Sequence, residues 1–320
     1  MTFFVLPSKL QMLMKFVYFG TSEFAVPPLV AIAPHVCLVV SQPDRPSGRG
    51  LKLTPSPVKL KALELGIKVL TPEKARDSEF VEFIQSLEVD ALIVAAYGQI
   101  LSPALLAAAK NGGINLHGSI LPMYRGAAPI QRAIQNGDLE TGVTLMQMSK
   151  GMDTGDIIDI VRTPIGSDET YGELLTRLSQ LAAIQIAEWA ERIASGNYPR
   201  KTQSEEWATY ASKIERSETE LYFHEPEHVA YDRFRAFTPS PACFLNTSKG
   251  RIKLSQVRLR AVDVEQPGTV ISLSPLLVGV GTGALELVAL QPEGKPKMSG
   301  EAWANGQRIK VGDSLVPDSQ

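Results

Sequence analysis

The first two-thirds of the chain alternates short apolar runs with longer segments whose apolar residues recur at helical spacing. The predicted strands are residues 16–19, 36–40, 67–70, 91–96, 113–117 and 143–148, and the predicted helices are 23–33, 58–65, 78–87, 103–109, 127–135 and 170–195. The run at 91–96 is apolar on both faces, as a central parallel strand is. Alternating strands and helices predict an α/β domain with a doubly wound, mostly parallel, Rossmann-like sheet.

The pattern changes after a polar, turn-rich stretch at residues 197–209, which we interpret as a linker. One helical segment at 225–237 follows it. The strand patterns of this part are residues 252–255, 268–271, 276–280 and 284–290. Short strands at this spacing predict a second, smaller domain built as an oligonucleotide-binding-like β-barrel. We therefore expect a first domain at 14–196 and a second at 210–320.

Residues 1–13 precede Met14, where the first strand pattern begins. Their only charge is Lys9, and they match neither a secretory signal nor a transit peptide. We interpret them as an extension or as the product of a mis-assigned start. The longest apolar runs of the chain fall far short of the ~20 residues that a membrane span needs. We therefore expect no contact with a membrane and a cytoplasmic location.

Charge and cysteine content restrict the partners further. The formal net charge is −2, so a nucleic-acid partner requires basic residues that are gathered locally. Cys37 and Cys243 lie far apart in the sequence, which favours small buried side chains over a disulfide and fits a reducing compartment.

Candidate chemistry is concentrated at the end of the strand predicted at 113–117. Asn115 and His117 point to one face, because side chains alternate along a strand. They lie at the carboxyl end, where open α/β sheets bind ligands. An amide and an imidazole together can donate two hydrogen bonds to a developing oxyanion, as acyl transfer requires. A lone histidine at a strand end is more often structural or solvated, but Asn115 and the following Gly118 favour a functional role.

Asp153 follows the strand predicted at 143–148 and therefore also lies at the carboxyl edge. From there its carboxylate could orient or charge the imidazole of His117 and relay a proton through water. The alternative is that Asp153 only forms a side-chain turn beside Gly155.

Basic residues gather in two places. The loop at 43–59 is rich in glycine and proline and carries Arg45, Arg49, Lys52 and Lys59 against one acid, so it could lie along a phosphate backbone or simply be solvated. In the second domain, two basic groups alternate with other residues between 249 and 260. Their members are Lys249, Arg251, Lys253, Arg258 and Arg260, with no acid among them in the sequence. Two basic features in an acidic chain predict one extended polyanion that contacts both domains.

Other site classes are not supported. The chain has no nucleophile-elbow pattern with a Ser-His-Asp set and no Walker loop, and the turn after Gly20 lacks the full dinucleotide-binding pattern. Four scattered histidines and two separate cysteines predict no metal site.

At these residues the sequence resembles the methionyl-tRNA formyltransferase family, from about Met14 almost to the C-terminus. The strongest segment is 115–129 (NLHGSILPMYRGAAP), and the likeness continues through 153–155, 19–24 and 43–59. Met123 departs from the pattern, since relatives often have a basic residue there. The resemblance implies that Asn115, His117 and Asp153 are catalytic. It implies that Ser119, Ile120, Leu121 and Pro122 bind folate and that Arg45 contacts tRNA.

The resemblance implies formyl transfer from 10-formyl-tetrahydrofolate to initiator methionyl-tRNA, without a metal. We extend the tRNA contacts to Arg49, Lys52, Lys59, Arg251 and Lys253, and we expect a monomer. Two other functions stay open. A formyltransferase for a purine precursor or an amino sugar would keep its turnover after Arg45→Ala and Arg49→Ala. A non-catalytic RNA-binding protein would bind tRNA without turnover.

Overall fold

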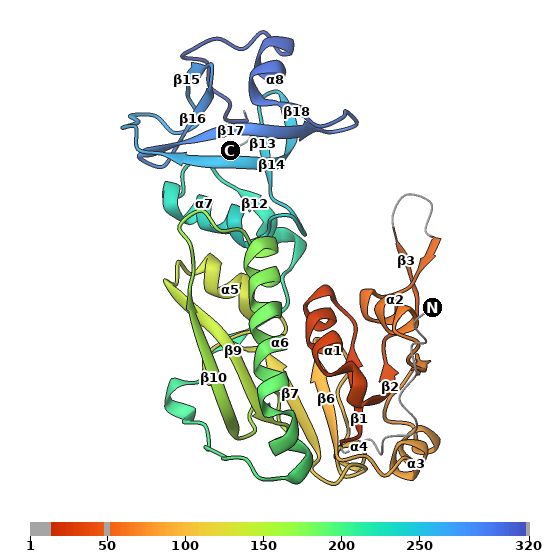
Figure 1. Cartoon of the computed structure of the whole chain (residues 1–320). Coiled ribbons are helices and arrows are strands. Elements are labelled where there is room, and N and C mark those ends of the chain that lie inside the picture. Colours follow the sequence, from red (N-terminus) through yellow and green to blue (C-terminus); the bar gives the residue numbers. More distant parts are fainter. Residues whose placement is uncertain (1–13, 48–51, 318–320) are drawn as a thin grey trace, which may run out of the picture. The chain divides into compact units, whose positions relative to one another are not determined.

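The computed structural model describes residues 14–47 and 52–317 (Figure 1). The prediction for residues 1–13 and the predicted tRNA contact at Arg49 lie outside these ranges. The described chain forms two compact units. One contains the chain up to Arg125 with Gly142–Arg162 and Thr176–Ala208, and the other contains Gly126–Thr141, Thr163–Leu175 and the chain from Thr209 on. The units are therefore interleaved in sequence, and the division at 196 and 210 stays a prediction.

A seven-stranded sheet organises the first unit, in the order β10-β9-β7-β6-β1-β2-β5. Its strands are β1 (Phe16–Gly20), β2 (Val36–Val40), β5 (Val69–Leu70), β6 (Ala91–Ala95), β7 (Gly113–His117), β9 (Glu140–Gln147) and β10 (Ile157–Pro164). β1 pairs in parallel with β2 and β6, and β6 with β7, whereas β9 is antiparallel to β7. The predicted doubly wound, mostly parallel sheet is confirmed.

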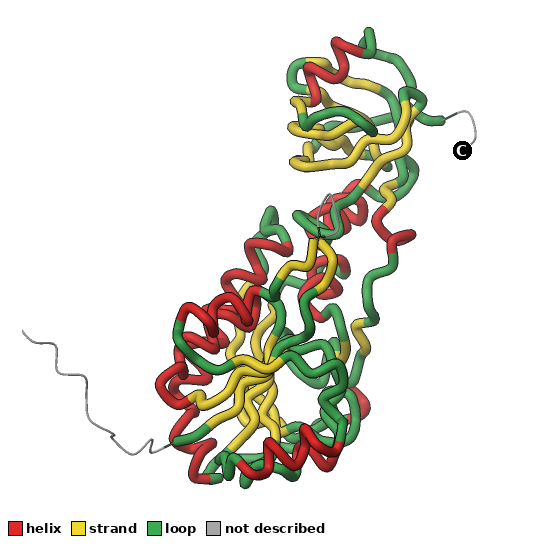
Figure 2. Tube along the Cα trace, turned by 90° about the vertical axis from the view of Figure 1, so that its right-hand side faces the viewer, coloured by secondary structure: helices red, strands yellow, loops and turns green. Residues whose placement is uncertain are grey.

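Helices lie on both sides of this sheet (Figure 2). They are α1 (Val26–Ile32), α2 (Pro57–Glu64), α3 (Ser78–Ser86), α4 (Pro103–Leu106) and α6 (Tyr171–Ser195). α3 and α4 cover one face, because Ile84 and Leu105 belong to one buried cluster with the β1 residues Val17 and Phe19. The intervening Phe16 and Tyr18 are also fully buried, which is why these strands read as continuous apolar runs.

Two predicted helices differ from those in the structure. The segment predicted as one helix at 23–33 is an α-helix between two 3-10 turns, Glu23–Ala25 and Ala33–His35. The proline pair at 27–28 explains where α1 begins, since proline fits the first helical turn but not the interior. The helix predicted at 103–109 ends at Leu106.

A second seven-stranded sheet organises the other unit. The strands of this sheet are β12 (Glu220–Leu221), β13 (Phe244–Thr247), β14 (Gly250–Arg260), β15 (Val270–Leu273), β16 (Leu276–Val280), β17 (Gly283–Pro292) and β18 (Met298–Ser299). The helices of the unit are α5 (Pro129–Gln135), α7 (Glu227–Ala236) and α8 (Gly300–Gly306). The pairing order is β12-β13-β14-β17-β16-β15, with β18 on β17. The second sheet domain is confirmed. Two further short strands, β8 (Arg125–Gly126) and β11 (Tyr210–Ala211), pair with each other in a separate two-stranded sheet.

The basic loop at 43–59 contains a hairpin. β3 (Arg45–Ser47) pairs antiparallel with β4 (Lys52–Thr54), with Arg45 opposite Thr54 and Ser47 opposite Lys52. Helix α2 begins directly after it, where the Ser56 hydroxyl accepts a hydrogen bond from the Lys59 backbone nitrogen and so caps the helix.

Candidate active site

The carboxyl end of β7 presents Asn115 and His117 on one face, as the two-residue period predicts. β7 is held on both sides, by β6 through the Val94–Asn115 register and by β9 through the His117–Thr144 register. The pair therefore rests on a rigid, internal strand of the sheet.

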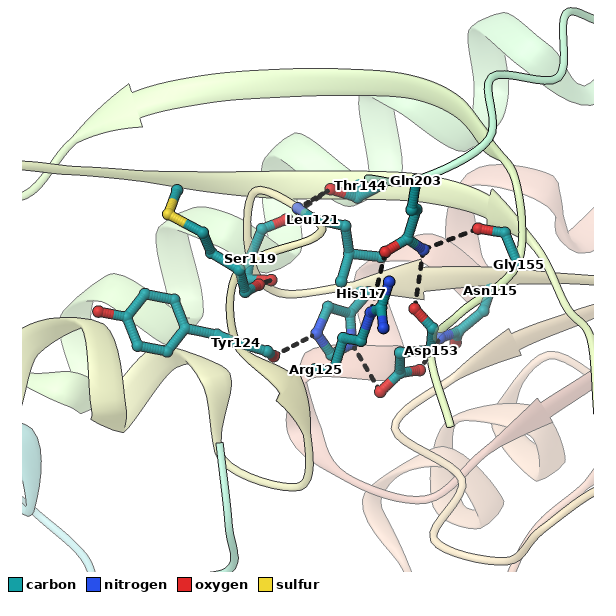
Figure 3. A network of polar contacts seen from close by, with 11 residues as sticks. Asn115, His117, Ser119, Leu121, Tyr124, Arg125, Thr144, Asp153, Gly155 and Gln203 are labelled. Atoms are coloured by element: carbon teal, nitrogen blue, oxygen red, sulfur yellow. Dashed lines mark hydrogen bonds and ion pairs between the residues drawn. The ribbon is translucent and has the colours of Figure 1, made fainter. Parts of the chain in front are cut away.

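Asp153 lies between these two side chains (Figure 3). Asn115 Nδ2 donates to Asp153 Oδ1 at 3.4 Å, and His117 Nδ1 lies 3.7 Å from Asp153 Oδ2. The side chains of His117 and Asp153 are 6% and 16% exposed, so the group is shielded from bulk water. The structure thus brings the three predicted residues together. Both distances are long for hydrogen bonds, and a substrate atom can replace them without breaking a strong bond.

His117 is oriented by its second ring nitrogen. Nε2 lies 2.9 Å from the Tyr124 carbonyl oxygen. A carbonyl oxygen only accepts hydrogen bonds, so Nε2 carries the proton and donates it. This contact fixes the ring plane and turns Nδ1 toward Asp153. The sequence gives no sign of the Tyr124 contact, because the partner of His117 is a backbone atom.

The turn after β7 contains the residues predicted to bind folate. Ser119, Ile120 and Leu121 are buried, and Pro122 is partly exposed. The Ser119 hydroxyl donates to the Met123 carbonyl at 2.7 Å. The Thr144 hydroxyl donates to the Ser119 carbonyl at 2.6 Å and accepts from the Leu121 backbone nitrogen at 3.1 Å. Sequence reasoning missed Thr144, which fixes this turn from the neighbouring strand β9.

A buried polar chain behind the site was also missed. Gln203 Nε2 donates to the backbone carbonyls of Asp153 and Gly155, at 2.8 and 2.7 Å, and its Oε1 accepts from Arg125 Nε at 3.0 Å. Arg125 is fully buried and donates two further hydrogen bonds to Glu205, both at 2.9 Å. These hydrogen bonds lower the pKa of the Glu205 carboxyl. Gln203 was missed because its segment has the composition of a polar linker. Arg125 was missed because a single buried arginine leaves no recognisable sequence pattern.

The predicted tRNA-binding residues of the first unit have different environments. Arg45 and Lys52 are exposed on the hairpin. Lys59 instead forms an ion pair with Asp44, with both carboxylate oxygens within 2.9 Å of its ammonium nitrogen. It therefore joins helix α2 to the start of the hairpin.

In the second unit, β14 alternates as expected at its start. Ile252 and Leu254 are buried, Lys253 is exposed and Arg251 is half-buried with its guanidinium 3.4 Å from the centre of the Phe244 ring. Two cavities of about 600 and 460 Å³ share Arg251. Their basic lining residues are Arg216, Arg251 and Lys253 in the first and Lys249, Arg251 and Lys295 in the second.

Further along β14, Arg258 and Arg260 contact a buried carboxylate, that of Glu286 on the paired strand β17. The absence of acids within the sequence of β14 is therefore misleading there, because the compensating charge comes from a neighbouring strand.

Within residues 14–47 and 52–317, no group of three or more His, Cys, Asp or Glu side chains could hold a metal ion. In the same part of the chain no helix is long and apolar enough to cross a membrane.

Comparison with known proteins agrees with this geometry. Residues 29–188 match the family model described as formyl transferase, and residues 213–308 match the formyl transferase C-terminal domain. The curated methionyl-tRNA formyltransferase of Symbiobacterium thermophilum is 41% identical over 95% of this chain and 96% of its own length. That of Neisseria meningitidis is 40% identical over 94% of this chain and all of its own length.

Solved structures agree at the level of the fold. An N-formyltransferase from Helicobacter canadensis, in complex with folinic acid and dTDP-3-aminofucose, has a TM-score of 0.65 and 20% identity, covering 85% of this chain and 98% of its own. HypX from Aquifex aeolicus, in complex with tetrahydrofolic acid, has a TM-score of 0.62 and 14% identity, covering 93% of this chain and 48% of its own.

The two family matches together span most of the chain and include the strand end that carries Asn115 and His117, so the chain belongs to the formyltransferase family. Relatives at about 40% identity over nearly the whole length narrow this further. Within the family, the chain belongs to the methionyl-tRNA formyltransferases.

Proposed function

We propose that this chain moves the formyl group of 10-formyl-tetrahydrofolate to the α-amino group of methionine on initiator methionyl-tRNA, and that Asn115, His117 and Asp153 carry the chemistry. The observation that carries the assignment of residues is the convergence of an amide and an imidazole on one carboxylate at the carboxyl end of β7. That arrangement offers two donors and one proton acceptor within a shielded volume.

In the proposed reaction the uncharged amino nitrogen attacks the formyl carbon, and the formyl oxygen takes up the negative charge. Asn115 Nδ2 and protonated His117 donate to that oxygen. The bond from the carbon to folate N10 then breaks, and the proton lost by the amine is delivered to N10. Asp153 faces both donors, so it can orient His117 and pass the proton through water. No covalent enzyme intermediate is needed.

The turn at residues 119–122 supplies the proposed folate contact. Its backbone is fixed by the Thr144 hydroxyl, and the Ser119 hydroxyl bonds the Met123 carbonyl, so the turn is preformed. Because Ser119, Ile120 and Leu121 are buried, they support the folate-binding surface from beneath, and Pro122 is the partly exposed member.

For the tRNA, the proposed contacts are Arg45, Arg49 and Lys52 on the hairpin and Arg251 and Lys253 beside the larger cavity of the second unit. Cationic side chains next to an aromatic ring suit a sugar-phosphate chain with stacked bases. Lys59 acts through its ion pair with Asp44, by holding the hairpin, rather than by direct contact. We further propose a cytoplasmic monomer.

The direct test offers purified protein 10-formyl-tetrahydrofolate together with initiator methionyl-tRNA or elongator methionyl-tRNA. Formyl-methionine on initiator tRNA alone is the expected product. Formylation of a small amine, with neither tRNA modified, would move the acceptor to another class. Equal formylation of both tRNAs would remove the initiator from the proposal.

A further inference from the structure

The segment that follows helix α6 runs directly beside the loop that carries Asp153. Lys201 and Ile157 exchange two backbone hydrogen bonds, at 2.8 and 2.9 Å, and the Thr202 hydroxyl donates to the Asp156 carboxylate at 3.1 Å. Gln203 is the single buried residue between positions 194 and 210, every residue of which the structure describes. A buried amide in an otherwise exposed segment indicates a specific contact.

The contacts of Gln203 can be made by glutamine alone among the natural side chains of its size. On one side, two carbonyl oxygens need a donor, and on the other, the Arg125 guanidinium needs an acceptor. Glutamate of equal length cannot donate when ionised, and asparagine is shorter by one methylene. Figure 3 shows the amide reaching both the Asp153 and the Gly155 carbonyls.

The loop that Gln203 holds has a backbone that needs support. Asp153 has a φ of 53°, a left-handed conformation that costs free energy for a residue other than glycine. Gly155 leaves no space for a side chain, since an added Cβ would overlap the Gln147 carbonyl oxygen. Gln203 binds the carbonyls on both sides of this strained stretch, and Arg125 with Glu205 fixes the orientation of its amide.

We propose that Gln203 is a positioning residue for catalysis, which holds Asp153 against Asn115 and His117 from a segment about fifty residues further along the chain. The proposal rests on the roles given to the trio under the proposed function. It gives Gln203, in the segment that follows α6, a role in the reaction in addition to the connection that this segment makes along the chain. Arg125, through its hydrogen bond to Oε1, selects the amide orientation that points Nε2 at the loop.

The first test measures steady-state formylation by Gln203→Ala and Gln203→Glu. Both should lower kcat by about 10- to 100-fold with KM for folate and tRNA nearly unchanged, because misplacing a catalytic group costs rate rather than binding. The matched control is Ser204→Ala, one residue away, exposed and without a side-chain cap hydrogen bond, which should keep wild-type kinetics. Melting curves of all variants show whether they fold, and unchanged kcat in a folded Gln203 variant overturns the proposal.

A double-mutant cycle with Asp153→Asn separates positioning from a general loss of structure. If Gln203 acts through Asp153, adding Gln203→Ala to Asp153→Asn should cost less than about twofold. If the two effects multiply, Gln203 does not act through Asp153 and the proposal fails. Wild-type protein without formyl transfer would instead refute the proposed function, so the two failures are distinguishable.

Discussion

Thr144 shows at the level of one residue how a buried hydroxyl can set the shape of a binding surface. It is fully buried on β9 and satisfies both a carbonyl and a backbone nitrogen of the turn at 119–122. Thr144→Val keeps the shape but leaves both backbone groups without a partner. We expect a loss of about 1–3 kcal/mol in the free energy of unfolding.

The same substitution should raise KM for 10-formyl-tetrahydrofolate more than KM for tRNA, because the turn lies under the proposed folate surface. Denaturant unfolding and steady-state kinetics provide the two readings. Thr282→Val, at an exposed position of the second unit, is the control. A variant with wild-type stability and wild-type KM for folate would show that the turn does not depend on Thr144.

At this scale, the site residues that sequence reasoning found are those with a local signature. Asn115 and His117 follow from the two-residue period of a strand. The expected shared carboxyl edge was wrong for Asp153, because β9 is antiparallel to β7 and its end at Gln147 lies beside Ile114; the loop after β9 nevertheless brings Asp153 to the pair. Gln203, Thr144 and the Tyr124 carbonyl have no such signature, because their roles depend on tertiary hydrogen bonds over long sequence separations.

Among the elements, the hairpin β3–β4 is held at its base and exposed along its strands. The Lys59–Asp44 ion pair joins it to α2, while Arg45 and Lys52 face solvent. Lys52→Met should weaken initiator tRNA binding and reduce the slope of log K against log salt by about one, as loss of one phosphate contact does.

The matched control is Lys61→Met on α2, whose ammonium is paired with Glu64 instead. Filter binding over a range of salt concentrations measures both variants. Lys61→Met should keep the affinity and the salt slope of the wild type. If Lys52→Met also keeps both, the hairpin face does not contact the nucleic acid.

Prediction of elements worked where apolar residues form compact runs and failed where they do not. The strand at 113–117 was predicted residue for residue, since it is buried on both sides. β10 was missed, because this strand at the edge of its sheet is largely half-buried and mixes Asp159, Arg162 and Thr163 into its pattern. β3 and β4 were missed because three-residue strands have no detectable period.

On the scale of the whole molecule, the two units are interleaved, and this affects what a fragment can do. In the second unit, the buried Arg235 of α7 donates to the carbonyls of Gly166 and Glu169, and Tyr231 donates to Asp168. A fragment of residues 210–320 lacks these partners and also α5, against which α7 packs. Arg235 would keep its ion pair with Asp232 on the same helix but lose both carbonyl acceptors, and a buried donor without an acceptor is costly.

We therefore expect the amides of α7 to lose hydrogen-exchange protection in the 210–320 fragment, while those of β14 and β17 keep more of theirs. The whole chain under the same conditions is the reference. Equal protection of α7 in both would mean that the second domain is independent from residue 210 on, as the sequence pattern predicted.

Single-turnover formyl transfer to initiator methionyl-tRNA by wild type, Asn115→Ala and His117→Ala tests directly whether the end of β7 is the catalytic centre. Loss of one oxyanion donor should lower the rate by about 100-fold or more, roughly 3 kcal/mol of barrier. Binding of tRNA, measured separately, should be unchanged. Rates within tenfold of the wild type for both variants would contradict the assignment of this strand end as the catalytic centre.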